Sequence, residues 1–406
     1  MTGDRFEVAV VGAGPVGLAA ALAFAQAGLA TCLVGPEPER RDGRTAALLG
    51  PSVDLLRDIE IWPALAEASG PLRVLRIVDD TGSLFRPPPV SFRADEIGLE
   101  AFGWNVENAR LAGILADAAR AQSGLTWSTA LVGGFETDDL AHLSCLDGSR
   151  IAASLVVAAD GRHSRVREAA GITTSERSYR QSAFTTILRH ERPHGDASTE
   201  FHTGSGPFTL VPLPGRRSSL VWVTLPRHAE RLMGASDADL AFAVEAAAAS
   251  LLGTMTVAGP RGTVPLSTMS VSGYVGPRLA LAGEAAHVLP PIGAQGLNLG
   301  LADVAALVRM LTASRAEGID VGAEAGLARY ARERQNDVRL RSVAVDGLNR
   351  SLLAGFAPID AARGIGLGLL GGIGPLRRAV MRAGLAGGVS HPGVSRGRAS
   401  AGSSRS

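Results

Sequence analysis

The chain has 406 residues, of which 46% are hydrophobic and 19% charged, so it is long enough for two domains. Forty basic and 39 acidic residues give a formal net charge of +1, which excludes a global field that would recruit nucleic acid. Cys32 and Cys145 lie in apolar runs and are expected to be reduced core residues of a cytoplasmic protein. The first residues lack the apolar stretch of a signal peptide, and no apolar run of about 20 residues predicts a membrane-spanning helix.

The first predicted elements form a strand–turn–helix–strand unit. Residues 6–11 (FEVAVV) are an apolar run typical of a buried parallel strand. Residues 16–27 predict a helix that ends at Gly28, and residues 30–34 predict a second strand. This order is the βαβ unit in which a glycine-rich turn gains a specific meaning.

The turn between the first strand and the helix has the pattern Gly12-x-Gly14-Pro15-x-Gly17. Gly12 permits a tight turn, Gly14 lets the backbone approach a pyrophosphate, and Gly17 lets the helix pack closely on the strand. Unpaired N–H groups at the helix N-terminus add a partial positive charge beside the phosphates. The sequence therefore predicts a dinucleotide site at this turn.

The acid that usually holds the adenosine ribose is missing. It is expected at the end of the second strand, near position 35, where this chain has Gly35. Glu37 follows after Pro36, and two interpretations of it stand. Either Glu37 reaches the ribose from the loop, or it is simply solvated.

Beyond this unit, helical and strand-rich stretches alternate. Helices are predicted at 45–70 (with Pro51 in the first turn), 106–122, 237–252 and 296–312. Strands are predicted within 72–104 and 180–270, and at 125–135, 141–146, 151–158 and 278–282. The nucleotide-binding pieces are thus interleaved with an antiparallel module, which predicts two intertwined domains.

A second segment of interest follows the strand at 151–158. This strand runs into Asp160-Gly161, where Gly161 permits a sharp turn and Asp160 can accept hydrogen bonds. An Asp-Gly pair alone indicates only a turn. Its position, after the strand-rich stretch that follows the nucleotide unit, makes it a candidate part of the site.

A third segment joins the strand at 278–282 to Gly283-Glu284 and then to a glycine-punctuated loop that opens a helix near residue 296. The carboxylate of Glu284 suits the ribityl hydroxyls of a flavin. The N-terminus of the helix suits the negative charge that reduction builds on the pyrimidine end of the ring. His287 lies nearby, but no second His or Cys stands at ligand spacing, so no metal site is predicted.

In this order and spacing, the three segments resemble the flavoprotein aromatic hydroxylases (class A monooxygenases). Within them the chain is most similar to the hydroxylases of ubiquinone biosynthesis. The resemblance runs from about residue 5 to 385 and is carried by DGRTAAL at 42–48, GPFTLVPLPGRRSSLVW at 206–222, GEAAH at 283–287 and QGLNLGLAD at 295–303.

The resemblance implies roles for single residues. Gly12, Gly14 and Gly17 match the pyrophosphate fingerprint. Arg44 matches an arginine that holds the flavin nucleotide, and Arg110 matches a polar residue that contacts it from a helix. Asp160-Gly161 matches a motif that serves both FAD and the nicotinamide cofactor. Glu284 stands where the family commonly has Asp, and the loop beside the isoalloxazine is matched by Gly293, Gly296, Leu297 and Asn298.

The implied fold is α/β, a Rossmann-like FAD-binding domain interleaved with an antiparallel β-sheet substrate domain. We expect the FAD-binding domain to comprise 1–75, 105–180 and 272–350, and the substrate domain 76–104 and 181–271. A C-terminal helical segment is expected at 351–388 and a disordered tail at 389–406. Within that segment, residues 364–385 are open to two interpretations: a helix at a membrane surface, or a helix packed on the flavin domain.

The resemblance also implies a mechanism. NAD(P)H reduces FAD, and O₂ forms a flavin C4a-hydroperoxide whose distal oxygen attacks an electron-rich, (poly)prenylated phenol. The protein excludes water and positions the ring, so no side chain is predicted to be a catalytic acid or base. Because this substrate is very apolar, we expect the enzyme to bind it at the inner membrane surface or to receive it from other enzymes of a biosynthetic complex.

Three hypotheses on function follow. The first is a hydroxylase of ubiquinone biosynthesis that uses FAD, NAD(P)H and O₂. The second is a class A hydroxylase of a soluble phenol, for which the same flavin motifs would serve. The third is a flavin-binding scaffold without catalysis, which the departures at Gly35 and Glu284 keep open.

Overall fold

The computed structural model describes residues 5–38, 43–81, 88–290, 295–353 and 374–386. The predicted strand–turn–helix–strand unit opens the fold as β1 (Arg5–Val11), α1 (Pro15–Gln26) and β2 (Thr31–Val34). Pro15 stands in the first turn of α1, where its missing N–H costs nothing. Gly28 follows the helix with a φ of +82°, a conformation that favours glycine. β1 and β2 are parallel, so α1 is a crossover helix.

β1 lies near the middle of an eight-stranded sheet with the order β18-β19-β11-β1-β2-β8, to which β10 and β9 add an antiparallel extension. The pairs of β1 with β2 and β11, of β2 with β8 and of β11 with β19 are parallel. The remaining strands are β8 (Leu125–Ser128), β9 (Val132–Thr137), β10 (Ala141–Cys145), β11 (Arg150–Ala158), β18 (Val275–Gly276) and β19 (Leu279–Leu281).

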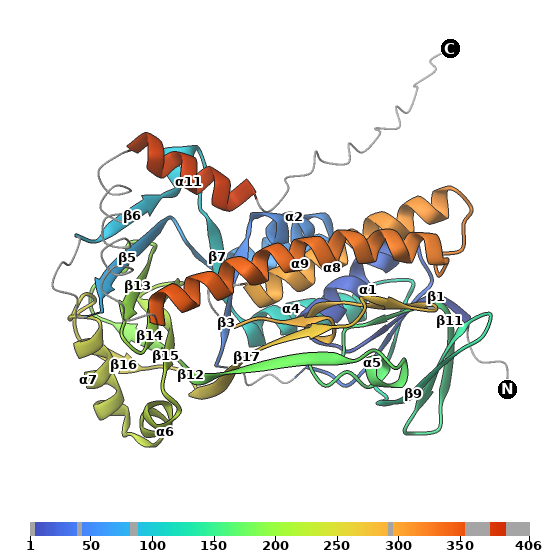
Figure 1. Cartoon of the computed structure of the whole chain (residues 1–406), viewed down its shortest axis with the longest axis horizontal. Coiled ribbons are helices and arrows are strands. Elements are labelled where there is room, and N and C mark those ends of the chain that lie inside the picture. Colours follow the sequence, from blue (N-terminus) through green and yellow to red (C-terminus); the bar gives the residue numbers. More distant parts are fainter. Residues whose placement is uncertain (1–4, 39–42, 82–87, 291–294, 354–373, 387–406) are drawn as a thin grey trace, which may run out of the picture.

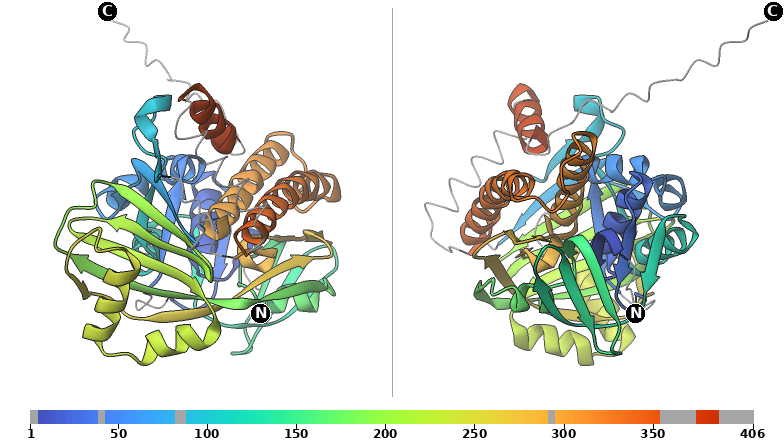
Figure 2. Two further views of the ribbon diagram at one scale, coloured as in Figure 1. Left: turned by 60° about the vertical axis from the view of Figure 1, so that its left-hand side comes forward. Right: turned by 90° about the vertical axis from the view of Figure 1, so that its right-hand side faces the viewer.

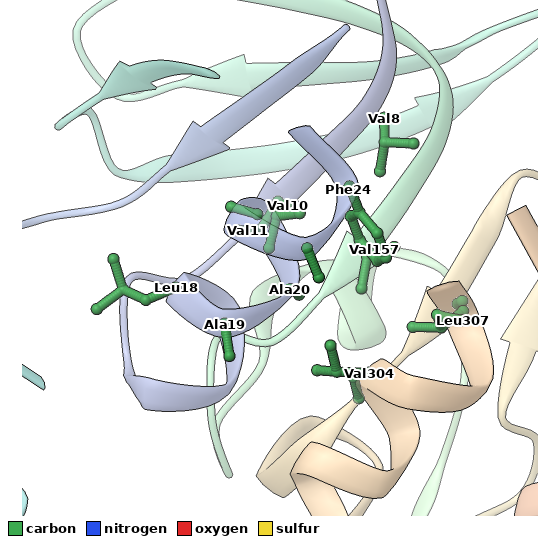
Figure 3. Close-up of a cluster of buried hydrophobic side chains, with 14 of the residues drawn as sticks. Val8, Val10, Val11, Leu18, Ala19, Ala20, Phe24, Val157, Val304 and Leu307 are labelled. Atoms are coloured by element: carbon green, nitrogen blue, oxygen red, sulfur yellow. The ribbon is translucent and has the colours of Figure 1, made fainter. Parts of the chain in front are cut away.

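The main core lies between this sheet and its helices. In Figure 3, side chains of β1, α1, β11 and α8 (Gln295–Ala316) form one apolar cluster: Val8, Val10, Val11, Leu18, Ala19, Ala20, Phe24, Val157, Val304 and Leu307. Alanines along α1 keep its side chains short, which allows close packing of helix on sheet. Cys32 and Cys145 are buried and free, as predicted.

Helix α8 is, within the described residues, the one helix whose length and apolar composition would suffice to cross a membrane. It packs against α1, against α2 (Gly50–Asp58) and against the long α9 (Glu324–Leu353), which runs beside it (Figures 1 and 2). We therefore assign α8 as a core helix. α4 (Asn108–Ala121) packs on α1 from another side.

A small three-stranded sheet connects the two larger ones. It consists of β3 (Thr45–Leu49), β7 (Gly103–Glu107) and β4 (Gly70–Pro71), all antiparallel. The prediction of a helix from residue 45 is therefore wrong for 45–49. The helices start later, as α2 and α3 (Trp62–Ala66), because residues 45–49 pair with the distant β7.

The antiparallel module is a nine-stranded sheet with the order β20-β17-β12-β15-β14-β13-β5-β6, and β16 pairs with β12. Its strands are β5 (Val74–Asp80), β6 (Val90–Arg93), β12 (Thr174–His190), β13 (Ala197–Thr203), β14 (Gly206–Leu213), β15 (Arg217–Thr224), β16 (Met255–Val257), β17 (Gly262–Val271) and β20 (His287–Val288). α6 (Pro226–Gly234), which was not predicted, and α7 (Asp237–Ala247) cover one face (Figure 1).

The predicted architecture is confirmed: a parallel α/β sheet is interleaved with an antiparallel sheet. The interleaving is visible in β12, which leaves α5 (Arg165–Ala169) beside the first sheet and runs through the second.

The C-terminal helix α11 (Gly374–Ala386) packs on the antiparallel module, not on the flavin domain as one interpretation had it. Met381 is buried with Ala94 and Phe102, near the short 3₁₀ helix η1 (Ala94–Ile97). Figure 2 shows α11 beside this turn and apart from α8 and α9. Residues 354–373 and the predicted tail at 389–406 lie outside the described residues.

Candidate FAD-binding site

A cleft of about 740 Å³ opens where β1, β2 and β11 end. The carboxyl ends of parallel strands are where α/β sheets bind their ligands, because the connections diverge there. Several predicted residues line it, together with others: Val11, Gly12, Ala13, Gly14, Pro15, Val34, Gly35, Pro36, Glu37, Pro38, Arg44, Asn108, Ala109, Ala112, Ala130, Leu131, Val132, Ala159, Asp160, Gly161, His163 and Arg165. The cleft thus brings the first two predicted segments together.

Each of the three glycines of the turn has different steric surroundings. Gly12 has a φ of +104°, and a Cβ there would collide with the carbonyl of Ala159. A Cβ on Gly17 would collide with the carbonyl of Gly12, so Gly17 lets α1 lie close to the turn. Gly14 caps α1 and meets nothing within 4 Å in the direction of a Cβ. The open side of the turn is therefore at Gly14, where a pyrophosphate could approach the backbone.

Gly35 occupies the place of the missing acid for a steric reason. Its φ is +151°, and a Cβ would lie 3.1 Å from the backbone nitrogen of Ala13 and 3.3 Å from Cα of Gly12. Its carbonyl accepts a hydrogen bond of 3.0 Å from Nε1 of Trp127. The end of β2 is thus pressed against the glycine turn, and a larger residue would push that turn away.

Glu37 lines the cleft two residues later at an exposed position. Its carboxylate pairs with the guanidinium of Arg120 on α4 at 2.7 Å, although both side chains are partly exposed. Arg120 also pairs with Asp117 at 2.8 Å and lies over the ring of Trp127. These contacts hold Glu37 at the rim of the cleft, so that a carboxylate stands near the end of β2 in spite of Gly35.

Arg44 and the first residues of α4 form another wall. The backbone N–H of Asn108 donates to the carbonyl of Arg44 at 3.0 Å, and both residues line the cleft. Arg110 is exposed and is not among the lining residues. Asn108, which was not among the predicted site residues, lines the cleft two residues before Arg110. The signal that could have found it is the start of the predicted helix at 106–122, directly after a strand.

Asp160 ends β11 at the floor of the cleft. Its Oδ2 accepts the N–H of Val166 at 3.4 Å, whereas its buried Oδ1 has no hydrogen-bond partner in the described part of the chain. Burial raises the pKa of Asp160 above its ordinary value, because the carboxylate is kept from water. An unpartnered buried acceptor is what a ligand hydroxyl would satisfy.

The third predicted segment packs against the first. Gly283, with a φ of +61°, and Gly300 of α8 both lie against Val16 of α1: a Cβ on Gly283 would come within 3.2 Å of its side chain, and one on Gly300 within 2.6 Å. Glu284, in the short 3₁₀ helix η2 (Gly283–Ala285), is exposed and does not line the cleft.

Asp303 organises this segment from within the core. Its Oδ2 accepts hydrogen bonds of 2.8 Å from the N–H of Gly283 and from Nε2 of His287, and its Oδ1 pairs with Arg334 of α9 at 2.6 Å. Burial raises the pKa of Asp303, but the charges of His287 and Arg334 oppose this and leave it below its ordinary value. His287 therefore belongs to a structural ion cluster. No group of three or more His, Cys, Asp or Glu side chains in the described structure is placed to hold a metal.

Asn298 connects the start of α8 to the small sheet. Its side chain accepts from the N–H of Leu49 at 2.9 Å and from Oγ of Ser52 at 2.7 Å, and donates to the carbonyl of Ala47 at 2.7 Å. Gly296 is exposed and Leu297 partly buried at the same helix start, whereas Gly293 lies outside the described residues. Gly296, Leu297 and Asn298 are not among the described residues that line the main cleft.

The family profile described as "FAD binding domain" matches residues 5–340, which include the cleft and the Asp303 cluster. The chain belongs to this FAD-binding family. Ubiquinone hydroxylase UbiL of Rhodospirillum rubrum is 35% identical over 93% of this chain and 88% of its own length. The 3-demethoxyubiquinol 3-hydroxylase of Escherichia coli is 32% identical over 94% of this chain and 99% of its own. These relatives are class A flavin monooxygenases, so the resemblance found in the sequence is confirmed.

Solved structures agree on the fold. The p-nitrophenol 4-monooxygenase PnpA from Pseudomonas putida DLL-E4 has a TM-score of 0.78 at 18% identity, covering 96% of this chain and 100% of its own. Klebsiella pneumoniae HpxO, solved with FAD and uric acid, has a TM-score of 0.75 at 21% identity, covering 94% and 97%. The chain thus has the aromatic-hydroxylase fold.

The residues of the cleft fit FAD. Gly14 leaves an open backbone approach at the N-terminus of α1 for the pyrophosphate, Asp160 offers an unpartnered acceptor to a hydroxyl, and Glu37 offers a carboxylate at the rim. When bound, FAD supplies the redox and oxygen chemistry of a monooxygenase. Gly14, Asp160 and Glu37 would hold the cofactor in the cleft.

Proposed function

We propose that this FAD-dependent monooxygenase hydroxylates a prenylated phenol ring in ubiquinone biosynthesis, with NAD(P)H as reductant and O₂ as oxygen donor. The observation that carries the proposal is the pair of ubiquinone-pathway hydroxylases at 35% and 32% identity, each matching over more than nine-tenths of this chain. The glycine turn, Asp160 and the Asp303 cluster lie within the matched family region. The structure also accounts for Gly35, one of the two departures that had favoured a scaffold.

For the reductant, we propose transient docking near the flavin. No separate nicotinamide-binding domain is visible in the sequence. His163 and Arg165, which line the cleft beside Asp160-Gly161, offer polar groups to an anionic cofactor. We further propose a cytoplasmic protein that works at the inner membrane surface or beside other biosynthetic enzymes, because a prenylated phenol is poorly soluble in water.

The test is complementation of strains that each lack one ring hydroxylase of the pathway, with the quinone intermediates identified by mass spectrometry. We expect this chain to restore ubiquinone in one of these strains and to remove the under-hydroxylated intermediate that accumulates there. Purified protein should consume NAD(P)H and incorporate oxygen into that intermediate. If every strain keeps its intermediate, while small soluble phenols are hydroxylated at high rates, the soluble-phenol hypothesis replaces this one.

A further inference from the structure

The two faces of the nine-stranded sheet differ in what covers them. On one face Phe201, Phe208 and Trp222 stack edge to face, with ring centroids 5.6 and 4.9 Å apart along the row, under α6 and α7. Side chains alternate along a strand, so Glu200 and His202 of β13 point to the other face. Figures 1 and 2 place α6 and α7 on the side of this sheet away from α9.

The face with Glu200 is the one turned toward the FAD-binding module. In the sheet, Glu200 lies opposite Thr209, and Thr209 lies opposite Val221, so their side chains share one face. Ser219 is two residues before Val221 on the same strand, so its side chain is on this face too. Oγ of Ser219 accepts hydrogen bonds from Oγ1 of Thr45 at 2.8 Å and from Nδ2 of Asn105 at 3.1 Å. These two residues belong to β3 and β7, the small sheet that Asn298 ties to α8.

This face carries buried polar atoms without partners around an apolar patch. Nδ1 of His202, Oε1 of Gln181 and Oγ1 of Thr185 are buried and have no hydrogen-bond partner among the described residues. The three residues are 5%, 5% and 8% exposed. The apolar patch beside them consists of Tyr179, Ala183, Val221, Val223 and Leu266. Buried polar atoms left without partners beside an apolar cluster are candidates for contact with a ligand.

Among these three, His202 has a defined hydrogen-bonding state. Its Nε2 lies 2.8 Å from Oε1 of Glu200. The other carboxylate oxygen of Glu200 accepts a hydrogen bond of 3.4 Å from the hydroxyl of Thr209. A carboxylate only accepts, so Nε2 carries the hydrogen of this bond, and in the corresponding tautomer Nδ1 presents a lone pair. Asp79, which pairs with His202 on β5, is engaged by the N–H and the hydroxyl of Thr81. Glu200 therefore sets the tautomer.

We propose that His202, oriented by Glu200, accepts the hydrogen bond of the substrate's phenolic hydroxyl and so determines which ring is bound and how it is turned. Tyr179 and Val221, the partly buried members of the apolar patch, contact the face of the ring, and Nδ1 accepts the O–H at its edge. His202 is a specificity-determining residue in this scheme, and Glu200 is a positioning residue. The inference rests on the proposed function only in taking the substrate to be a phenol.

The test compares binding of three probes to the FAD-loaded protein without reductant, followed by perturbation of the flavin absorption spectrum. The probes are 2-prenylphenol, its methyl ether and prenylbenzene, of which only the first can donate a hydrogen bond. We expect wild type to bind the phenol roughly tenfold more tightly than the other two, the magnitude of one net hydrogen bond. His202→Phe should lower this ratio to about one, and His202→Asn, which restores an acceptor oxygen, should recover part of it.

His190 provides the matched control, because it is a buried histidine of the same sheet whose two ring nitrogens are both engaged, by the carbonyl of Arg192 at 2.7 Å and by Oγ of Ser218 at 3.1 Å. His190→Phe should leave the ratio unchanged, even if it weakens all three probes.

The outcomes separate the two proposals. A preference for the phenol that survives in folded His202→Phe overturns the role of His202. A methyl ether bound as tightly as the phenol by wild type overturns it without any variant, because Nδ1 as an acceptor requires a donor. Wild type that binds none of the three probes overturns the proposed function itself, and this inference with it.

Discussion

The carboxylate of Asp160 is buried at the floor of the cleft, with Oδ1 lacking a partner in the described structure. Burial raises its pKa, so its ionised form is less favourable in the folded protein than in the unfolded chain. By linkage, the contribution of Asp160 to stability is fully present below its unfolded-state pKa and is lost as pH rises through the raised folded-state value. At neutral pH, Asp160 therefore lowers the stability of the cofactor-free protein, while its unpartnered oxygen can accept a hydrogen bond from the cofactor.

We expect Asp160→Asn to raise the melting temperature of the cofactor-free protein at neutral pH and to weaken FAD binding about tenfold. The amide removes the buried charge, and it accepts a hydroxyl less strongly than a carboxylate does. Melting curves and flavin-fluorescence titration measure the two effects. Asp147→Asn, at an exposed turn, is the control and should change neither. An Asp160→Asn protein with unchanged FAD affinity would contradict a contact between Asp160 and the cofactor.

At this scale, much of the site was predictable. Gly12, Gly14, Gly17 and Asp160 are marked by local sequence, because a strand, a turn and a helix follow one another within a few residues. The engagement of Glu37 by Arg120 was not predictable, because the two residues meet only once α4 packs beside β8. The contacts of Asn298 with β3 depend on tertiary packing in the same way.

At the scale of elements, the glycine turn allows a matched pair of substitutions. Gly17→Ala puts a methyl group into the carbonyl of Gly12, whereas Gly14→Ala points into open space and keeps a φ near −74° that alanine adopts readily. We expect Gly17→Ala to lower stability and FAD affinity together. Gly14→Ala should leave the cofactor-free protein as stable as wild type and weaken FAD binding, because the methyl group occupies the approach to the pyrophosphate.

Thermal melting and FAD titration of the two variants test this. A Gly14→Ala protein that binds FAD as wild type does would show that the pyrophosphate does not approach at this position.

Asp303 joins η2, β20, α8 and α9 through Gly283, His287 and Arg334. We expect Asp303→Asn to lower the free energy of unfolding by about 3–5 kcal/mol at neutral pH, because it leaves a buried guanidinium and imidazole without their carboxylate. The folded-state pKa is depressed, so this contribution is present above the unfolded-state value of about 3.9 and is lost as pH falls through the lower folded-state value. The difference in the free energy of unfolding between wild type and Asp303→Asn should therefore become smaller at acid pH.

Urea unfolding at neutral and acid pH measures this difference. Glu333→Gln breaks the exposed pair between Arg309 and Glu333 and should cost no more than about 1 kcal/mol. Equal losses in the two variants would show that the Asp303 cluster contributes no more than a surface pair.

Element boundaries show where prediction from sequence stopped. The helix α1 and the strands around it were predicted closely, because apolar periodicity and a terminal glycine mark them locally. Residues 45–49 were misassigned because their strand exists only through pairing with β7. α6 was missed although Pro226 stands in its first turn, because its few apolar residues are surrounded by charged ones.

At the scale of the whole molecule, α11 ties the C-terminal region to the antiparallel sheet. Arg377 makes two hydrogen bonds to Glu96 at 2.8 and 3.0 Å, and both side chains are about one-fifth exposed. We expect Arg377→Gln to speed amide hydrogen exchange in α11 about tenfold or less while leaving α1 and α8 unchanged, because a partly exposed pair contributes on the order of 1 kcal/mol. Arg382→Gln, at an exposed position of the same helix, is the control. Faster exchange throughout the molecule would contradict a local role for this contact.

The strand order β19-β11-β1-β2 has a consequence for how the protein is made. Neighbouring strands of the central sheet come from the start, the middle and the last third of the chain. At synthesis rates of about 5–20 residues per second, on the order of ten to fifty seconds separate the emergence of β1 from that of β19. After β11 has emerged and until β19 follows, residues 156–158 of β11 lack their partner strand, and this edge is open to pairing with other chains. The Asp303 cluster closes later still, because it requires Arg334 of α9.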